Sequence, residues 1–185
     1  MNSIPLHTNE LAARLAQLRA GDRVSLSGVI YTARDAAHKR LFELLDRGEP
    51  LPFPLKGAVI YYAGPTPGQQ GMAVGACGPT TAGRMDGFAP RLLDLGLTAM
   101  IGKGERNQAV KDAIVHNGAG YFAAVGGAGA LIARCIETAE VIAFEDLGCE
   151  SIKRMTIRDL PLTLAIDSQG RDLFRQGRAE YAKQA

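Results

Sequence analysis

The 185-residue sequence contains no tryptophan, only three cysteines, and few aromatic residues (6% of the chain). Cys77, Cys135 and Cys149 are widely spaced, and none of them lies in a Cys-x-x-Cys or mixed Cys/His pattern. This spacing argues against a disulfide framework and provides no ligand set for a metal in this chain. Because free cysteine is commonly buried, Cys135 is expected to be a small core residue on an apolar helix face.

The sequence also lacks a block of one charge and a long apolar run. Its 21 basic and 19 acidic residues are spread along the chain and give a formal net charge of +2. Nucleic acid and anionic membranes are therefore not expected as partners. No apolar run reaches the roughly 18 to 20 residues of a spanning helix, and the first ten residues lack the order of a signal peptide. We expect one compact domain in the cytoplasm.

Segments typical of strands alternate with segments of helical periodicity. Predicted strands cover 23–30, 58–62, 72–77, 98–101, 121–125, 141–144 and 162–166. Predicted helices cover 10–18 (capped by Thr8), 35–45, 108–117 (stopped by Gly118), 130–138, a segment with Leu92, Leu93 and Leu95 that ends at Gly96, and a C-terminal segment from Arg171. The alternation predicts an α/β fold with a partly parallel central sheet. Residues 1–20 are expected to be a peripheral segment before a domain of residues 21–185.

Three cationic residues follow predicted strands or their loops: Arg34, Arg84 and Lys103. In an α/β sheet, ligands bind beyond the carboxyl ends of strands, where helix N-termini already favour an anion. Each cation alone is more often a solvated surface charge. Their coincidence at one predicted edge favours an anion site, and Lys103 is the sharpest of the three because its glycine neighbours permit close approach and positive φ.

Other residues near these junctions have simpler explanations. Thr80 and Thr81 can be helix caps, and a catalytic hydroxyl would need an activating neighbour that the sequence does not identify. His38 lies one turn from Arg34 and is expected to be a packing or hydrogen-bonding residue that supports the site. The glycine-rich segment 126–129 lacks a complete G-x-G-x-x-G pattern, so it predicts close packing with some capacity to bind an anion.

The junctions read Thr-Ala-Arg-Asp-Ala-Ala-His-Lys-Arg (32–40), Gly-Pro-Thr-Thr-Ala-Gly-Arg-Met-Asp (78–86) and Gly-Lys-Gly (102–104). In order and spacing they resemble the β part of iron-sulfur fumarate hydratases, and the resemblance extends from about residue 21 to 170. It implies a swivelling β/β/α domain that partners an α subunit holding a [4Fe-4S] cluster through three cysteines. The motifs do not fix the stoichiometry, and a hetero-oligomer such as α2β2 is expected.

The same resemblance implies roles for individual residues. Arg34, Arg84 and Lys103 would bind the carboxylates of a C4 dicarboxylate, and Thr80, with Lys103, would belong to the catalytic groups, with Thr80 moving the proton at carbon. His38 and Thr81 would support them, and no residue of this chain would bind a metal. An acidic residue of the partner would assist Thr80. The implied reaction is the interconversion of fumarate and (S)-malate.

Two alternatives remain open from the sequence. L-Tartrate dehydratase β subunits share the architecture, and the residues that select malate over tartrate can lie on the partner. A non-catalytic anion-binding or assembly module could also retain the fold. A gene for a cysteine-bearing partner beside this one favours the enzyme, and its absence favours the module.

Overall fold

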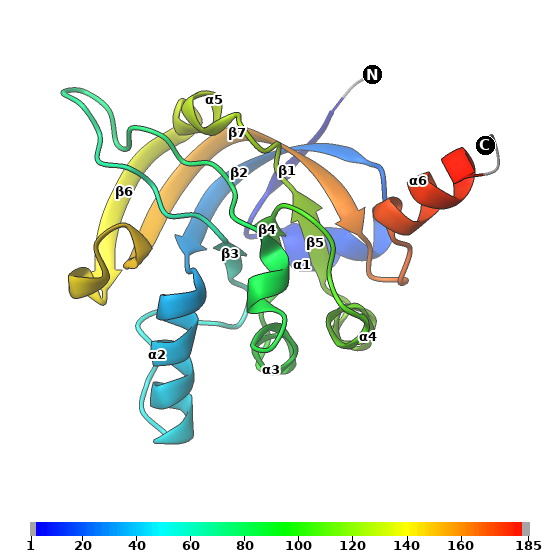
Figure 1. Ribbon diagram of the computed structural model, residues 1–185, viewed down its shortest axis with the longest axis horizontal. Coiled ribbons are helices and arrows are strands. Elements are labelled where there is room, and N and C mark those ends of the chain that lie inside the picture. Colours follow the sequence, from blue (N-terminus) through cyan, green and yellow to red (C-terminus); the bar gives the residue numbers. More distant parts are fainter. Residues whose placement is uncertain (1–2, 183–185) are drawn as a thin grey trace.

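The computed structural model describes residues 3–182, which form a mixed α/β fold. One seven-stranded sheet has the order β1-β2-β3-β4-β5-β7-β6, and β2 also pairs with β7, so five strands close into a barrel-like ring (Figure 1). The strands are β1 (Ile4–His7), β2 (Arg23–Thr32), β3 (Val59–Tyr61), β4 (Ala99–Gly102), β5 (Gly120–Ala123), β6 (Ile136–Ala143) and β7 (Ile152–Ile166). The helices are α1 (Leu11–Arg14), α2 (Asp35–Asp46), α3 (Ala89–Asp94), α4 (Gln108–Asn117), α5 (Gly129–Ala133) and α6 (Leu173–Tyr181), with 3-10 helices η1 (Leu15–Gln17), η2 (Ala82–Met85) and η3 (Glu145–Glu150).

The partly parallel sheet predicted from the sequence is confirmed. Strands β1 to β5 are parallel to their neighbours, and β7 is antiparallel to β2, β5 and β6. The carboxyl ends of β2, β3 and β4 therefore lie at the same end of the ring, which is where an α/β sheet usually carries its ligand site.

Neighbouring residues at β3 supply two separate hydrophobic cores. Val59 and Tyr61 belong to the core inside the ring, whereas Ile60 and Tyr62 belong to the core between the sheet and helices α2, α3 and α4. This alternation follows from the geometry of a strand, in which successive side chains point to opposite faces. Figure 1 shows the three helices together on one side of the sheet.

The first residues of the described chain add a strand to the sheet and side chains to the inner core. Strand β1 pairs with β2, and Leu6, Leu11, Leu15 and Leu18 are buried in the inner core. The boundary between a peripheral segment and a domain at residue 21 stays a prediction. The predicted capping role of Thr8 is wrong, because its hydroxyl accepts a hydrogen bond from the Val29 amide (3.0 Å) and the short α1 begins after Glu10.

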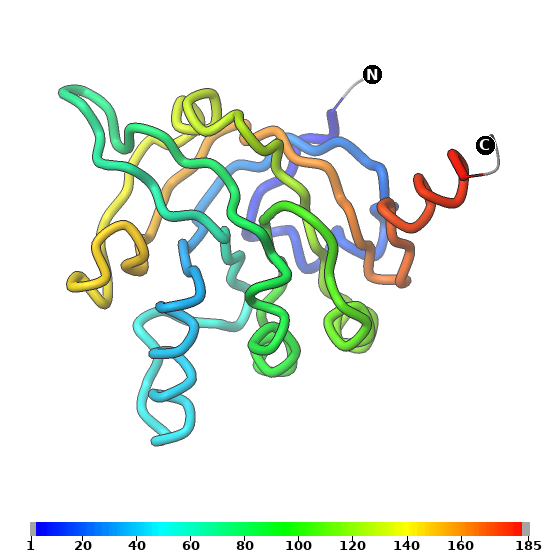
Figure 2. Tube along the Cα trace, viewed as in Figure 1, coloured from blue at the N-terminus to red at the C-terminus, as the bar shows by residue number. Residues whose placement is uncertain are grey.

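Residues 72–77 form no strand, so that prediction is wrong. They belong to an arm, residues 64–77, that folds back on itself through hydrogen bonds from the Thr66 amide to the Ala76 carbonyl (2.9 Å) and from the Gly75 amide to the Thr66 carbonyl (3.0 Å). Figure 2 shows this arm reaching away from the ring. The apolar residues Val74 and Cys77 of the segment are buried in the inner core, although its backbone forms no strand with the sheet.

The predicted helix over 130–138 ends too late, because α5 stops at Ala133 and β6 begins at Ile136. Pairing of β6 with the long strand β7 overrides the local helical pattern. Cys135 consequently lies between the two elements and is only partly buried, so its expected place on a helix face is wrong. Leu95, expected on the apolar face of a helix, is 46% exposed, because α3 ends at Asp94.

The predicted helix over 108–117 is confirmed, and the C-terminal helix predicted from Arg171 is confirmed with a small shift. Helix α4 ends at Gly118, whose left-handed conformation (φ 63°) allows the helix to stop there. Helix α6 begins two residues after Arg171, where the Asp172 carboxylate accepts hydrogen bonds from the Phe174 and Arg175 amides. Within residues 3–182, no helix has the length and apolar content needed to cross a membrane.

Candidate functional site

The segments that carry the predicted site residues extend the sheet beyond β3 and β4. The Thr80 amide donates to the carbonyl of Tyr62 (2.7 Å), which directly follows β3. The Lys103 amide, directly after β4, donates to the Thr80 carbonyl (3.2 Å), and the Ala82 amide donates to the Lys103 carbonyl (2.8 Å). Two loops that are 20 residues apart in the sequence are thus fixed side by side by backbone hydrogen bonds.

Arg84 connects the loop that contains Thr80 to the start of helix α2. Its Nη2 donates to the hydroxyl of Thr80 (3.2 Å) and also to Oδ1 of Asp35 (3.2 Å). Thr80 precedes η2, and Thr81 occupies the N-cap position without a capping hydrogen bond from its side chain. Neither threonine hydroxyl therefore caps the helix, and Thr80 instead lies beside a guanidinium that stabilises negative charge on its oxygen.

Arg34 lies at the N-cap of α2, directly beyond β2, with its side chain 22% exposed. Its Nη2 lies 3.1 Å from Oε1 of Glu150, and its Nε lies 3.9 Å from Oδ1 of Asp35. Asp35 thus contacts both site arginines. A Cβ atom on Gly64 would lie 3.0 Å from Nη1 of Arg34, so the absence of a side chain there makes room for the guanidinium.

Lys103 is exposed and, within the described part of the chain, has no ion-pair partner. Gly104 beside it has φ of +81°, as the glycine pattern predicts. Gly126 faces the lysine, because a Cβ atom there would lie 3.6 Å from Cδ of Lys103. The charge of Lys103 is therefore available to bind an anion from outside the chain.

His38 lies beneath the segment that carries Arg34. It is fully buried, and its Nδ1 donates to the carbonyl of Arg34 (2.8 Å), which requires the proton on Nδ1. Its ring packs against Tyr62 and Phe88. Burial lowers the pKa of His38 to about 4, so the ring is neutral near pH 7. Thr81 contributes through its backbone, which forms a β-bridge with Lys103 while its side chain is exposed.

The structure gives three charged residues near the site a different environment from the one that the sequence suggests. Glu150 lies far from Arg34 in the chain and gives no local signal. Asp35 has the spacing for an ion pair with Lys39, but the structure pairs it with arginines. Arg106 belongs to a charged segment that is typical of a surface loop, yet only 4% of it is exposed.

The three cysteines do not fit an iron-sulfur cluster. Cys77 is buried, Cys135 is partly buried and Cys149 is exposed, on different segments. In the part of the chain that the structure describes, no three His, Cys, Asp or Glu side chains are placed to hold a metal ion. The site offers instead three cations and one hydroxyl, which suit the binding of a multiply charged carboxylate.

A sequence model of the family described as "Fumarase C-terminus" matches residues 1–177. The chain belongs to this family. It is 40% identical over 169 residues to "Fumarate hydratase class I, aerobic" of Escherichia coli K12, which covers 90% of this chain and 31% of that protein. It is 37% identical over 168 residues to "Fumarate hydratase 2" of Leishmania major, covering 90% of this chain and 30% of that protein.

A protein of Methanocaldococcus jannaschii named as L(+)-tartrate dehydratase subunit beta is also similar. The two are 34% identical over 166 residues, which covers 86% of this chain and 85% of that protein. The chain therefore spans about a third of the fumarate hydratases but most of this third family member. The family thus includes members in which this region is part of a longer chain and a member in which it is a protein of similar length.

Proposed function

We propose that this chain is the β subunit of a hydro-lyase that interconverts fumarate and (S)-malate. The observation that carries the proposal is the contact of Arg84 with both Thr80 and Asp35, on a loop held beside Lys103. This contact places anion-binding side chains beside a hydroxyl group. The chain in which they lie belongs to the fumarase C-terminus family. An α subunit would carry a [4Fe-4S] cluster, which supplies the Lewis acid for the substrate hydroxyl.

In this proposal Arg34, Arg84 and Lys103 bind the two carboxylates of a C4 dicarboxylate. Removal of a proton from the carbon next to a carboxylate places negative charge on that carboxylate. Fixed cations in a site from which the partner excludes water stabilise this charge by several kcal/mol. Asp35 and Glu150 hold the arginines in place without neutralising Lys103.

Thr80 would move the proton at carbon. An unactivated alcohol is a poor base near neutral pH, and the hydrogen bond from Arg84 favours the deprotonated oxygen. An acidic residue of the partner would accept the proton from the hydroxyl. Lys103 would act with Thr80 as a catalytic group by stabilising charge on the same substrate.

The partner would dock on an uncharged rim, which we define as residues 65–76 of the arm and residues 125–131. No Asp, Glu, Lys or Arg occurs between Lys56 and Arg84 or between Asp112 and Arg134. The two parts of the rim meet at Ala76, because a Cβ atom on Gly129 would lie 3.5 Å from Cβ of Ala76, and the adjoining Cys77 amide donates to the Gly129 carbonyl (3.0 Å).

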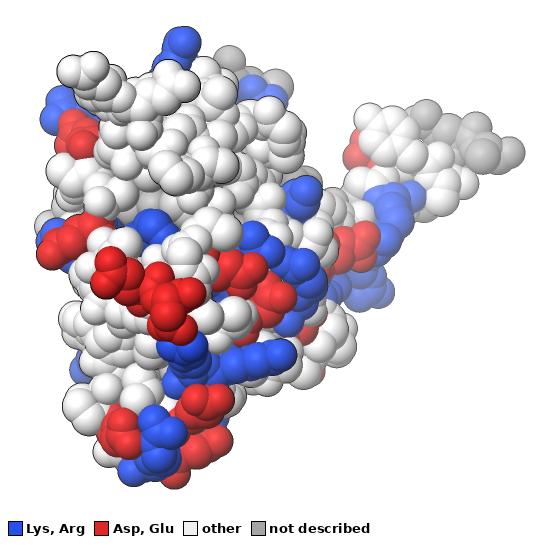
Figure 3. Space-filling model, turned by 60° about the vertical axis from the view of Figure 1, so that its left-hand side comes forward, with Lys and Arg blue, Asp and Glu red and all other residues white. Residues whose placement is uncertain are grey.

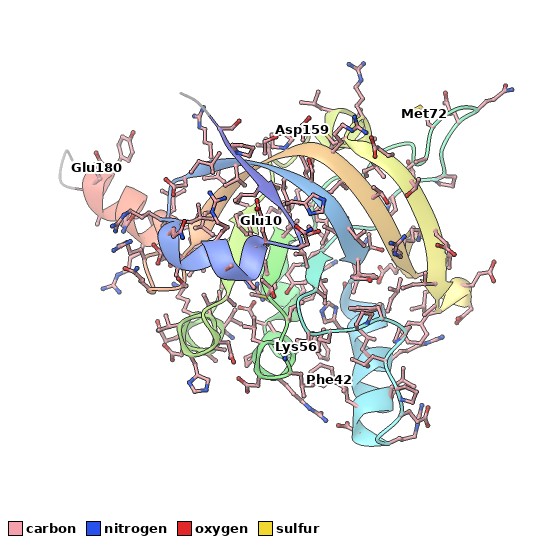
Figure 4. All side chains as sticks on the ribbon, turned by 180° about the vertical axis from the view of Figure 1, so that it is seen from behind. Glu10, Phe42, Lys56, Met72, Asp159 and Glu180 are labelled. Atoms are coloured by element: carbon pink, nitrogen blue, oxygen red, sulfur yellow. The ribbon has the colours of Figure 1, made fainter. Side chains whose placement is uncertain are left out.

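The rim includes three exposed apolar side chains, those of Met72 (44%), Val125 (70%) and Leu131 (58%). Figure 3 shows a broad area of uncharged residues in the upper half of the face in view, and Figure 4 shows Met72 on the arm, far from Phe42 of α2. The rim adjoins Thr80 in the sequence and Lys103 in space, through Gly126. A protein bound to the rim would therefore lie beside Lys103.

The domain would swivel against the partner as a β/β/α module, in an assembly such as α2β2. The three cysteines are unpaired in the structure, which suits the reducing cytoplasm. The name of the M. jannaschii protein favours a second candidate, the β subunit of L-tartrate dehydratase.

Co-expression tests the proposal. The chain would be purified alone and together with a candidate cysteine-bearing partner, and both would be assayed anaerobically with fumarate, (S)-malate and L-tartrate. We expect no turnover by the chain alone and conversion of malate and fumarate by the assembly. Turnover of tartrate alone would select the second candidate, and malate turnover by the chain without a partner would refute the subunit assignment.

A further inference from the structure

Arg106 is the one lysine or arginine that is buried among residues 3–182. Its Nε donates to Oδ1 of Asp86 (2.6 Å), and its guanidinium lies over the rings of Tyr62 (5.4 Å) and Tyr121 (5.0 Å). Its Nη2 also donates to the Tyr62 hydroxyl (3.5 Å). Burying a charge is costly, and even a paired and hydrogen-bonded buried charge contributes little net stability. Stability alone therefore does not explain why Arg106 is buried here.

Asp86 connects Arg106 to the segment that carries Arg84. It lies two residues after Arg84 at the end of η2, and it is only 8% exposed. Its second oxygen accepts a hydrogen bond from the Asn107 amide (2.6 Å). Both carboxylate oxygens therefore bind the segment that begins at Lys103, and they tie it to the segment that carries Arg84.

Tyr62 extends the network to the other site residues. Its carbonyl accepts the Thr80 amide (2.7 Å), and its ring packs against His38, which holds the Arg34 carbonyl. A Cβ atom on Gly102 would lie 2.9 Å from Cδ2 of Tyr62, so the backbone before Lys103 approaches this ring as closely as glycine allows. The three loops of the site therefore rest on one buried group of side chains.

We infer that Arg106 is a positioning residue, which with Asp86 and Tyr62 fixes the loops of Arg84 and Lys103 at the separation that the substrate requires. The inference rests on the proposed function of the site. A buried ion pair is a weak source of stability compared with apolar residues of similar volume, but it imposes a defined geometry. Small displacements of groups that bind a substrate reduce the rate strongly, because the reacting atoms leave their aligned positions.

Replacement of Arg106 tests the inference. Arg106→Met removes the charge and keeps the length, and Arg106→Lys restores part of the interaction. Lys111→Met is the matched control, because Lys111 pairs with the buried Asp172 between α4 and α6, outside the site. In the assembled enzyme we expect Arg106→Met to lower kcat about 10- to 100-fold and to raise KM, with partial recovery in Arg106→Lys. Lys111→Met should keep both constants near those of the wild type.

Hydrogen exchange on the chain alone gives a second readout that does not need activity. The Ala82 and Lys103 amides, which connect the two loops, should exchange faster in Arg106→Met, whereas amides of the β6–β7 ladder should not change. If Arg106→Met does not fold, Asp86→Asn and Tyr62→Phe are measured in the same way.

The two readouts separate the inference from the proposed function. Kinetic constants equal to those of Lys111→Met, together with unchanged exchange at Ala82 and Lys103, overturn the positioning role. If the wild-type assembly has no hydro-lyase activity, the proposed function fails, and hydrogen exchange alone decides whether Arg106 holds the two loops together.

Discussion

Nη2 of Arg84 lies 3.2 Å from the hydroxyl oxygen of Thr80 and donates a hydrogen bond to it. The sequence spacing of four residues predicts this contact if the segment is helical. The contact is present in the structure although η2 begins only at Ala82. The hydrogen bond from the Thr80 amide to the Tyr62 carbonyl holds Thr80 in place beside this helix. The contact turns a hydroxyl of ordinary acidity into a candidate for proton transfer.

The first prediction concerns Thr80→Val, which keeps the shape of the side chain and removes the hydroxyl. In the assembled enzyme we expect a loss of about 100-fold or more in kcat, since that is the usual scale for removing a general acid or base. KM for malate should change little, because the three cations remain. The measurement is steady-state malate dehydration under anaerobic conditions, with thermal unfolding of the same preparation.

Thr81→Val serves as the control, because its exposed side chain makes no capping hydrogen bond. It should retain kcat. A Thr80→Val enzyme with normal kcat and a lowered melting temperature would show that the hydroxyl is structural, since removal of such a local hydrogen bond costs about 1 kcal/mol.

The second prediction separates Lys103 from the arginines. Lys103→Met should lower kcat/KM about 10- to 100-fold, because a charge-assisted contact with a carboxylate is lost. Its free energy of unfolding should stay within about 0.5 kcal/mol of the wild type, since the side chain is exposed and has no ion-pair partner in the described chain. Equilibrium denaturation and malate kinetics measure the two quantities.

The third prediction concerns Arg34→Met, which should also lower kcat/KM about 10- to 100-fold and should in addition destabilise the chain, because Glu150 loses its partner. Arg40→Met is the control: Arg40 lies on the same helix and pairs with Asp146 of η3, but it lies in no site loop. It should keep normal kinetics. Equal kinetics for Arg34→Met and Arg40→Met would make Arg34 an ordinary surface charge.

Much of the site could be predicted because it lies in short segments directly after strands. The apolar strands before Arg34 and Lys103 and the glycines around Lys103 are local signals, and the structure places both residues beyond β2 and β4. Glu150 and Arg106 could not be predicted, because their roles depend on partners that are distant in the sequence. Charged residues in loops are usually solvated, so composition alone misplaces Arg106.

The incorrect predictions of secondary structure have a similar origin. The arm has the apolar residues of a strand, but Thr66 pairs with Gly75 and Ala76 of the same arm and not with a strand of the sheet, which no local pattern reveals. The early end of α5 is decided by pairing of β6 with β7, a tertiary contact that overrides helix propensity. Helix α4, by contrast, has its N-cap Asn107 and its terminal Gly118 in the sequence, so both ends were predictable.

The fourth prediction tests the uncharged rim. Val125→Asp places a charge on the rim beside the site, and we expect it to weaken association with the partner at least 10-fold, because a carboxylate must be desolvated at the interface. Val115→Asp is the control, since Val115 is an exposed valine (46%) on α4, outside the rim. The measurement is the dissociation constant of the purified subunits, and equal constants for the two variants would place the partner elsewhere.

The last prediction concerns the pH dependence of stability. Burial lowers the pKa of His38 to about 4 in the folded chain, from an ordinary value of 6.5. Above pH 6.5 the ring is neutral in both states, and its full contribution to stability is present. Between pH 6.5 and 4 the unfolded chain binds a proton that the folded chain does not, so the free energy of unfolding falls. The total fall attributable to His38 is about 3 kcal/mol.

His38→Gln should therefore be less stable than the wild type at pH 8, because the hydrogen bond to the Arg34 carbonyl is weakened, but its stability should fall less steeply between pH 6.5 and 4. His116→Gln, which replaces an exposed histidine of α4, is the control for the loss of a histidine as such. Urea denaturation at half-unit pH intervals measures all three proteins, and carboxylate titrations common to them cancel in the comparison. If His38→Gln and the wild type lose stability in parallel over this range, the ring is not buried in its neutral form, and the support that it gives to Arg34 must be reconsidered.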